Sequence, residues 1–376
     1  MSYSSEVAVL SSPTHDLRIA VIAPSRFPVA EPFAGGQESF VWHLCATLRA
    51  RGAQVVLYAP AGSDPSICDE LQAFPPVTLS DASWMDTTCP PPEEIGSHLA
   101  YLWAMQQLRH RVDIDVVHNH SLHHYPVALA DLVPAPMLTT LHTPPFGWLE
   151  VCAQLAGERH VFTGVSAFLA AQWSTLSARI RVVHNGVDPA RFPPGPGGEA
   201  LAWVGRITPE KAPHLTIRAA LRSGRPLRIA GPVSDKEYAA THVFPAIDGV
   251  RVQYAGHLSG RELAAFYGSS AATLVTPDWP EPFGLVAAES LMCGTPVVAL
   301  ARGGLTEIVR PGLNGALVDD PDELAGGVAI VDSLDRAQIR TAAERHLSVD
   351  VMMDSYLRLY QGLTANRSHT ALSHPV

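Results

Sequence analysis

Two glutamates, eight residues apart, form the most informative pattern in the sequence. Glu281 and Glu289 lie in the segment Asp278–Val298, DWPEPFGLVAAESLMCGTPVV. An apolar run before it predicts a strand, and Gly284 opens a helix whose first N–H groups can bind an anion. Because Gly284 has no side chain, a phosphate can approach the backbone closely. A carboxylate beside a bound phosphate must accept hydrogen bonds from neutral donors such as sugar hydroxyls, so the segment indicates a nucleotide-sugar site.

Two cations follow another expected strand. Arg206 and Lys211 lie in the segment Trp203–Lys211, WVGRITPEK, between an apolar run and an amphipathic stretch. Arginine offers a planar fork of donors and lysine a compact charge, and both bind phosphate oxygens. At the carboxyl end of a strand, these side chains reach the edge of the sheet where α/β proteins bind ligands. The pair therefore indicates a phosphate site.

The N-terminal half offers a glycine loop and a histidine at comparable positions. Gly35 and Gly36 follow the first expected strand and precede a helix that contains Glu38. The glycines let the loop approach a ligand, and the helix start adds another positive end. His142 ends a further expected strand, so the topology places it in a ligand crevice. A Pro-containing loop, residues 24–32, is a candidate wall of the same pocket.

These segments together resemble a known enzyme family. The nonapeptide Glu281–Glu289, EPFGLVAAE, is similar to the E-x7-E motif of the retaining glycosyltransferases of family 4. The segment Gly205–Lys211 resembles that family's G-R-x4-K arrangement, and Gly35–Glu38 resembles its G-G-x-E loop. The resemblance extends over about residues 17–360. It implies the GT-B fold, in which two Rossmann-like, doubly wound domains face each other across a cleft.

The resemblance also implies a role for each residue of the donor site. Glu281 would hold the hydroxyls of the transferred sugar, and Glu289 the hydroxyls of the ribose. Arg206 and Lys211 would neutralise the leaving diphosphate, and His142 would lie near the sugar and the departing phosphate. The expected catalytic residues are His142, Arg206, Lys211 and Glu281. Loop and backbone contacts to the donor are expected from Gly35, Gly36, Leu258, Phe283, Gly284, Leu285 and Val286.

The implied reaction moves a sugar from a nucleoside diphosphate sugar to a small acceptor with retention at the anomeric carbon. A carboxylate at Glu289 that binds both ribose hydroxyls favours a UDP-, GDP- or ADP-sugar over a deoxythymidine one, and a UDP- or GDP-sugar is the preferred donor. No cofactor and no metal is expected, because the cations and helix ends already supply positive charge. A nucleotide-sugar 2-epimerase is an alternative on the same fold, and it would act on the donor alone.

The acceptor site is the least constrained part. Candidate acceptor contacts are Glu38, His118, Phe146 and Trp148, and the acceptor could be a sugar, a cyclitol, a thiol or a natural-product scaffold.

Histidines 118, 120, 123 and 124 cluster in VVHNHSLHHYP. Neutral imidazoles suit zinc or copper, so a metal-binding protein is a second alternative. The segment has no nearby cysteine and no H-E-x-x-H pattern, which favours residues that line the cleft, and no metal ligand is assigned.

Short apolar runs that alternate with amphipathic stretches must position these side chains. Runs rich in Val, Ile and Ala suit parallel strands buried on both faces. The expected strands span residues 18–23, 54–59, 114–118, 137–141, 161–165 and 180–183, then 201–205, 227–230, 250–254, 272–275 and 296–300. Expected helices between them include 38–49, 212–222 and 261–267. Repeated βα units in both halves predict two doubly wound α/β domains.

Proline and glycine mark the expected boundaries. The predicted parts are a disordered tail at 1–16, an N-terminal domain at 17–192, a linker at 193–198, a C-terminal domain at 199–350, a helix at 351–363 that crosses back to the first domain, and a disordered tail at 364–376. Residues 64–92 are expected to be irregular surface. Asn185–Gly186 is expected to be a turn without chemistry, and Gly303 and Gly304 to let the backbone approach the donor.

Composition excludes several classes of protein. The 376 residues suggest two domains at ~150 residues each, and 47% hydrophobic with 16% charged residues is typical of a globular chain. The net charge of −10 disfavours nucleic acid and acidic membrane surfaces as partners. Five scattered cysteines and an N-terminus unlike a signal peptide favour a cytoplasmic protein without a membrane span. The oligomeric state is left open.

Overall fold

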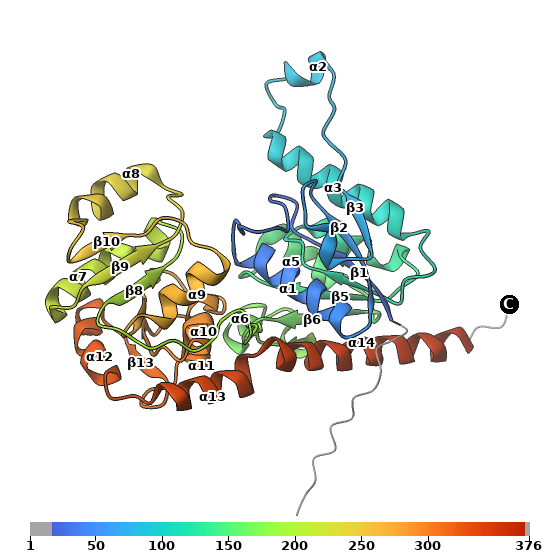
Figure 1. Cartoon of the computed structure of the whole chain (residues 1–376). Helices are drawn as coiled ribbons and strands as arrows, with labels where there is room; N and C mark the ends of the chain where they lie inside the picture. The colour runs from blue at the N-terminus through green and yellow to red at the C-terminus, as the bar shows by residue number, and fades with distance from the viewer. Residues whose placement is uncertain (1–16, 373–376) are drawn as a thin grey trace, which may run out of the picture.

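The computed structural model describes residues 17–372, which form two parallel α/β sheets (Figure 1). The first sheet has seven strands in the order β3-β2-β1-β4-β5-β6-β7, and the second has six in the order β10-β9-β8-β11-β12-β13. In each sheet the order reverses beside the first strand, and ligands of doubly wound sheets bind at such a point. The expected fold class is confirmed. Of the tails expected to be disordered, 1–16 and 364–376, residues 1–16 and 373–376 lie outside the described residues, whereas residues 364–372 belong to the last helix.

The strands of the first sheet are β1 (Arg18–Ile22), β2 (Gln54–Ala59), β3 (Glu70–Ala73), β4 (Val116–Asn119), β5 (Met137–Leu141), β6 (His160–Gly164) and β7 (Ile180–Val182). Those of the second are β8 (Leu201–Val204), β9 (Leu227–Ala230), β10 (Val252–Tyr254), β11 (Thr273–Val275), β12 (Val297–Leu300) and β13 (Gly315–Val318).

The helices are α1 (Gly36–Ala50), α2 (Asp81–Trp84), α3 (Pro92–Leu108), α4 (His124–Ala128), α5 (Gly147–Gln154), α6 (Ala167–Gln172) and α7 (Pro213–Ser223), followed by α8 (Lys236–Tyr238), α9 (Gly260–Gly268), α10 (Leu285–Met292), α11 (Leu305–Ile308), α12 (Leu324–Val331), α13 (Arg336–Leu347) and α14 (Val349–Leu372).

Two edge strands, β3 and β13, were not among the expected strands. The segment ELQA of β3 is half polar and sits at the sheet edge beside β2, where only one neighbour constrains it. Strand β13 is four residues long and begins with Gly315. Short edge strands lack the continuous apolar run that identifies a buried central strand. The Pro-rich segment 64–92 is therefore only partly irregular, and its helix α2 projects beyond the rest of the domain in Figure 1.

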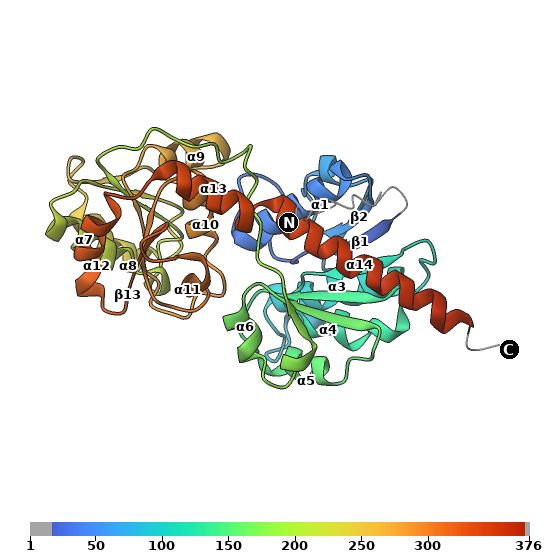
Figure 2. The same ribbon diagram turned by 90° about the horizontal axis from the view of Figure 1, so that it is seen from below.

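The last helix joins the two halves. Figures 1 and 2 show α14 leaving the C-terminal half beside α13 and running along the N-terminal half, where it packs against α1 and β4. Its Met353, Tyr356 and Tyr360 are fully buried in the core around β1, β2 and α1. The helix continues to Leu372, past residue 363, where the sequence analysis ended it. No glycine or proline follows Gly362 within the helix, so nothing in the sequence stops it there.

The Pro/Gly segment between the halves lies against the C-terminal half. Gly195 N–H donates to the carbonyl of Cys293, and Gly197 N–H donates to that of Gly268. A Cβ on Gly195 would lie 2.3 Å from the Cα of Gly268, so only glycine allows this approach. The adjacent Phe192 belongs to a hydrophobic core that contains residues of both halves. The connection is thus part of the packing between the domains.

Candidate active site

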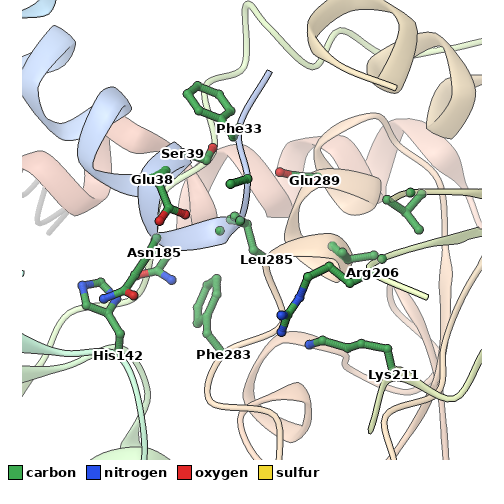
Figure 3. A pocket seen from close by; sticks show the side chains of 18 of the residues that line it. Phe33, Glu38, Ser39, His142, Asn185, Arg206, Lys211, Phe283, Leu285 and Glu289 are labelled. Carbon is green, nitrogen blue, oxygen red and sulfur yellow. The ribbon is translucent and has the colours of Figure 1, made fainter. Parts of the chain in front are cut away.

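A cavity of about 690 Å³ lies between the two halves and brings most of the expected site residues together. Figure 3 shows Glu38, Asn185 and His142 on its N-terminal side and Arg206 and Lys211 on the other. Expected residues that line it are Gly35, Gly36, Glu38, His142, Arg206, Lys211, Leu258, Glu281, Phe283, Gly284, Leu285, Val286 and Glu289. Three candidate acceptor contacts, His118, Phe146 and Trp148, do not line it.

The starts of two helices face each other across this cavity. Helix α1 begins at Gly36 with Gly35 as its N-cap, and α10 begins at Leu285 with Gly284 as its N-cap. A Cβ on Gly36 would lie 3.6 Å from Leu285 Cδ2, so the two loops come into contact. The unpaired N–H groups of a helix start carry partial positive charge. The cavity therefore has a positive end on each side, one from each domain.

Lys211 and Glu281 form an ion pair in the cavity wall. Lys211 Nζ lies 2.6 Å from Glu281 Oε2, and both side chains are largely buried. The indole N–H of Trp279 donates to the same oxygen at 3.1 Å. Lys211 Nζ also lies 5.3 Å from the centre of the Trp279 ring. Two donors on Oε2 fix the Glu281 carboxylate and leave Oε1 to face other partners.

Trp279 is a site residue that the sequence analysis did not single out. It lines the cavity, and its ring and N–H contact the two residues to which the family resemblance gives catalytic roles. Its position two residues before Glu281 was the only available signal, because an indole can reach its near neighbours in a loop.

Glu289 lies on the first turns of α10 with its carboxyl group at the cavity wall. Its side chain is buried, and Tyr267 on α9 donates its hydroxyl to Oε2 at 2.9 Å. Burial raises the pKa of Glu289 to about 7, although the Tyr267 hydrogen bond opposes the shift. The carboxyl group is therefore held in one orientation and exchanges its proton near neutral pH.

Glu38 and Arg206 interact across the cavity. Arg206 follows β8, is half-exposed, and lies 3.7 Å from Glu210. Glu38 is buried on the first turn of α1, and burial raises the pKa of its carboxyl group despite the nearby charges of Arg206 and Arg26. A buried carboxyl group with a perturbed pKa in a cavity is a candidate for binding or proton transfer to a ligand.

His142 is neutral and is oriented by a second histidine. Its Nε2 lies 3.0 Å from Nδ1 of the buried His120, and burial lowers the pKa of His142 to about 3. Asn185 lines the cavity nearby (Figure 3). Its Oδ1 is buried without a hydrogen-bond partner among the described residues, so it is an acceptor available to a ligand hydroxyl. The sequence predicts only a turn at Asn185, because an Asn-Gly pair is a strong turn former.

His118 is a structural residue, contrary to its expected contact with an acceptor. It is fully buried in β4, its Nδ1 lies 2.6 Å from the hydroxyl of Tyr360 on α14, and its Nε2 lies 2.8 Å from Thr140 Oγ1. Both ring nitrogens are thus occupied away from the cavity. Phe146 and Trp148 lie at the start of α5 on the surface, and Trp148 is 75% exposed.

Gly303 and Gly304 pack against the loop between β11 and α10, which we call the donor loop (residues 276–284), and not against the cavity itself. A Cβ on Gly303 would lie 2.2 Å from the carbonyl oxygen of Glu281, and Gly304 N–H donates to that oxygen at 2.7 Å. The pair lies outside the cavity lining. Because both residues lack a side chain, their backbone can pack directly against the backbone of Glu281. The prediction that this pair approaches the donor is therefore corrected: it contacts the loop that carries Glu281 instead.

Comparison with known proteins identifies the family. Residues 34–191 match the family described as Glycosyltransferase Family 4, and residues 190–345 match Glycosyl transferases group 1. A glycogen synthase of Mycobacterium tuberculosis is 30% identical over 365 residues, covering 85% of this chain and 86% of that protein. A D-inositol 3-phosphate glycosyltransferase of Mycolicibacterium vanbaalenii is 29% identical over 437 aligned positions, with 93% of each chain covered.

Solved structures share the fold. The Anabaena protein Alr3699/HepE, solved in complex with UDP-glucose, superposes with a TM-score of 0.68 at 17% identity, over 92% of this chain and 100% of that one. Sucrose-phosphate synthase from Thermosynechococcus elongatus gives a TM-score of 0.72 at 19% identity, over 93% and 100%. Within the described residues 17–372, no helix is long and apolar enough to cross a bilayer.

The fold, the two matched family models and the relatives aligned over most of the chain all indicate a glycosyltransferase. The chain belongs to glycosyltransferase family 4 and is a retaining glycosyltransferase that uses a nucleotide sugar as donor.

Proposed function

We propose that the enzyme transfers a sugar from a UDP- or GDP-sugar to a small, polyhydroxylated, soluble acceptor. The observation that carries the proposal is the single cavity that contains Arg206, Lys211, Glu281 and Glu289 opposite Glu38. The C-terminal wall thus offers cations and helix N–H groups that can bind a diphosphate. Beside them it offers carboxylates that can bind the hydroxyls of the sugar and the ribose. The other wall offers a buried carboxyl group for a second substrate.

The donor occupies the C-terminal side. The Glu289 carboxylate accepts hydrogen bonds from both ribose hydroxyls, and Tyr267 holds it in place for them. Glu281 accepts from the hydroxyls of the sugar, and the backbone around Leu258 borders the base. UDP is our first choice of nucleotide, because the fold relative Alr3699/HepE was solved with UDP-glucose.

The acceptor enters from the N-terminal side. Glu38, Asn185 and His142 offer hydrogen-bonding groups to its hydroxyls there. A cyclitol or a sugar fits this set, and the relatives named D-inositol 3-phosphate glycosyltransferase support a compact acceptor. Neutral His142 can contact a hydroxyl without competing with the cations for the diphosphate.

Positive charge at the leaving group drives the transfer. Arg206, Lys211 and the start of α10 stabilise the diphosphate as its bond to the sugar breaks. The leaving phosphate oxygen takes the proton of the attacking acceptor hydroxyl on the same face of the sugar, which retains the anomeric configuration. Because these groups supply the charge, transfer needs no metal ion.

A ligand panel tests the proposal. Thermal shifts with UDP, GDP, ADP and their common sugars identify the donor, since a ligand at 100 times its Kd stabilises the fold by ~2.7 kcal/mol. The donor is then incubated with cyclitols and simple sugars, and NMR of the product gives its anomeric configuration. A retained glycoside supports the proposal. An epimerised nucleotide sugar formed from donor alone, with no glycoside, overturns it in favour of the 2-epimerase.

A further inference from the structure

The histidine-rich segment after β4 divides into two groups with different surroundings. His118 and His120 are fully buried beneath α14 and beside His142. His123 and His124 turn the other way, to the start of α4, and meet His98 of α3. A ring nitrogen from each of His98, His123 and His124 lies within 4.8 Å of the others. This second group, which we call the α3–α4 histidine cluster, includes a residue 25 positions away in the sequence.

Hydrogen bonds leave one ring nitrogen of His98 and one of His123 without a partner among the described residues. Nδ1 of His98 lies 2.9 Å from the carbonyl oxygen of Glu94, which can only accept, so Nδ1 carries the proton and Nε2 has a lone pair. A metal-binding histidine usually donates its other N–H to a carbonyl in this way. His123 Nδ1 accepts from Tyr125 N–H at 3.1 Å, and its Nε2 is buried without a partner among the described residues.

Packing holds the three rings together. The rings of His123 and His124 stack with centres 4.3 Å apart, and His98 meets His123 edge-on at 4.6 Å. The exposed indole of Trp148 stacks on His124 at 5.8 Å. Burial lowers the pKa of both His123 and His124, which is the direction that favours the neutral ring. Neutral imidazole is the form that ligates metal ions.

We propose that the α3–α4 histidine cluster binds a late first-row divalent ion such as Zn²⁺, Ni²⁺ or Cu²⁺ through His98, His123 and His124. Imidazole ligands select these ions over Mg²⁺ and Ca²⁺. Binding through His123 Nε2 moves the ring proton to Nδ1 and releases Tyr125 N–H, at the start of α4, to other partners. Three protein ligands leave a further position for water.

The ion would join α3 to α4 behind the acceptor side of the cavity. His123 and the neighbouring Ser97 line that cavity. The site is separate from the residues to which sugar transfer is assigned, so the enzyme can be a glycosyltransferase whether or not the ion binds.

Metal titration of the full chain without an affinity tag tests the site. We expect Zn²⁺ to bind at one ion per chain and to raise the melting temperature. His98→Ala and His124→Ala should each weaken this binding at least about tenfold, because loss of a ligand exceeds the effect of an outer partner. His110→Ala is the matched control, since His110 is an exposed histidine two residues after the end of α3 and is not part of the cluster.

The result that overturns the proposal is a wild-type affinity no tighter than that of His98→Ala and His124→Ala. His98→Gln keeps a side chain of similar reach and serves if the alanine variant melts abnormally without metal. Cu²⁺ quenching of tryptophan fluorescence locates the ion independently. Because Trp148 stacks on His124, the Trp148→Phe variant should lose part of the quenching. Equal quenching in wild type and Trp148→Phe contradicts a copper ion at this position.

Discussion

At the scale of single residues, the orientation of Glu281 depends on Lys211 and Trp279. One carboxylate oxygen of Glu281 takes both the lysine ammonium at 2.6 Å and the indole N–H at 3.1 Å. These contacts fix the plane of the carboxylate and direct its second oxygen. In the proposed donor site, Trp279 is therefore a positioning residue for Glu281, and its ring packs against Lys211.

Replacing Trp279 with phenylalanine tests this role. The ring over Lys211 stays, while the hydrogen bond to a charged acceptor is lost. Such a bond contributes about 1.5–3 kcal/mol, so kcat should fall about 10-fold to 100-fold. The KM for the nucleotide sugar should change less, because the ribose and base contacts are untouched. Steady-state kinetics measures both constants, and Trp84→Phe, an exposed tryptophan on α2, is the control.

Glu289 predicts a pH dependence of donor binding. Its pKa is about 7, so the group is mainly protonated below that pH and ionised above it. In the proposed donor site the ionised form accepts hydrogen bonds from both ribose hydroxyls, so we expect donor affinity to rise as pH increases through 7. Titration calorimetry with the UDP-sugar from about pH 5 to about pH 9 measures this change. In Glu289→Gln the affinity should be weaker and should not change with pH across this range.

The same shift has a consequence for stability with a defined sign. Because the folded pKa of Glu289 is raised above its ordinary 4.5, the folded state binds more protons than the unfolded chain between pH 4.5 and about 7. This group's contribution to stability is therefore fully present below that window and is lost as pH rises through it. Glu289→Gln should gain melting temperature relative to the wild type as pH rises. A constant difference across the window would contradict a raised pKa.

At the scale of elements, glycines set how closely the donor loop and α10 approach their neighbours. Gly284 has φ 101° at the N-cap of α10, and a Cβ there would lie 2.5 Å from Leu305 Cδ2. Gly303 has φ 61° and lies under the carbonyl of Glu281. The residues before α11 hydrogen-bond to the backbone of the donor loop, and Leu305 of α11 packs against Gly284. These close contacts hold the start of α10 at the cavity.

Gly284→Ala should therefore lower both stability and activity. A left-handed φ in a residue with a side chain costs about 1–3 kcal/mol, and the contact with Leu305 adds to it. Gly249→Ala is the matched control, because Gly249 has φ 74° but no atom within 4 Å of a built Cβ. Urea unfolding should show a larger loss for Gly284→Ala than for Gly249→Ala. Equal losses would mean that Leu305 yields easily and that only the backbone angle matters.

At the scale of the whole molecule, contacts from several elements join the two domains. Glu307 of α11 accepts from the N–H groups of Ala167 and Phe168 at the start of α6, and it pairs with His184 at 3.0 Å. Ser166 donates its hydroxyl to the carbonyl of Pro282 in the donor loop at 2.6 Å. Helix α14 adds the long-range contact, since its Tyr360 reaches His118 in β4.

Removing the Tyr360 hydroxyl tests whether His118 stabilises the fold without taking part in catalysis. Tyr360→Phe leaves a buried histidine nitrogen without its partner, which costs about 1–3 kcal/mol. The melting temperature should fall while kcat and KM stay close to the wild-type values, because His118 does not line the cavity. Tyr125→Phe, a tyrosine near the surface of the same domain, should leave the melting temperature unchanged. A large rise in the acceptor KM of Tyr360→Phe would restore His118 to the acceptor site.

The sequence by itself determined the features that depend on local chemistry. Apolar runs such as residues 19–22 of β1 are typical of strands buried on both faces, and Gly284 before an apolar segment indicates a helix start. The central strands and the start of α10 therefore follow from the residues themselves. The spacing of Glu281 and Glu289 identified the family. The edge strands β3 and β13 escaped prediction because a strand with one neighbour needs no continuous apolar run.

Only the tertiary structure decided whether an individual polar side chain is buried or lines the cavity. His118 lies in β4 and His142 directly follows β5 of the same sheet. His118 is covered by Tyr360, 242 residues later in the chain, whereas His142 lines the cavity. His98 likewise meets His123 and His124 only because α3 packs beside α4. A side chain's local sequence fixes its backbone and its chemistry. The partner that buries it or leaves it open comes from distant segments, whose positions result from packing the whole chain.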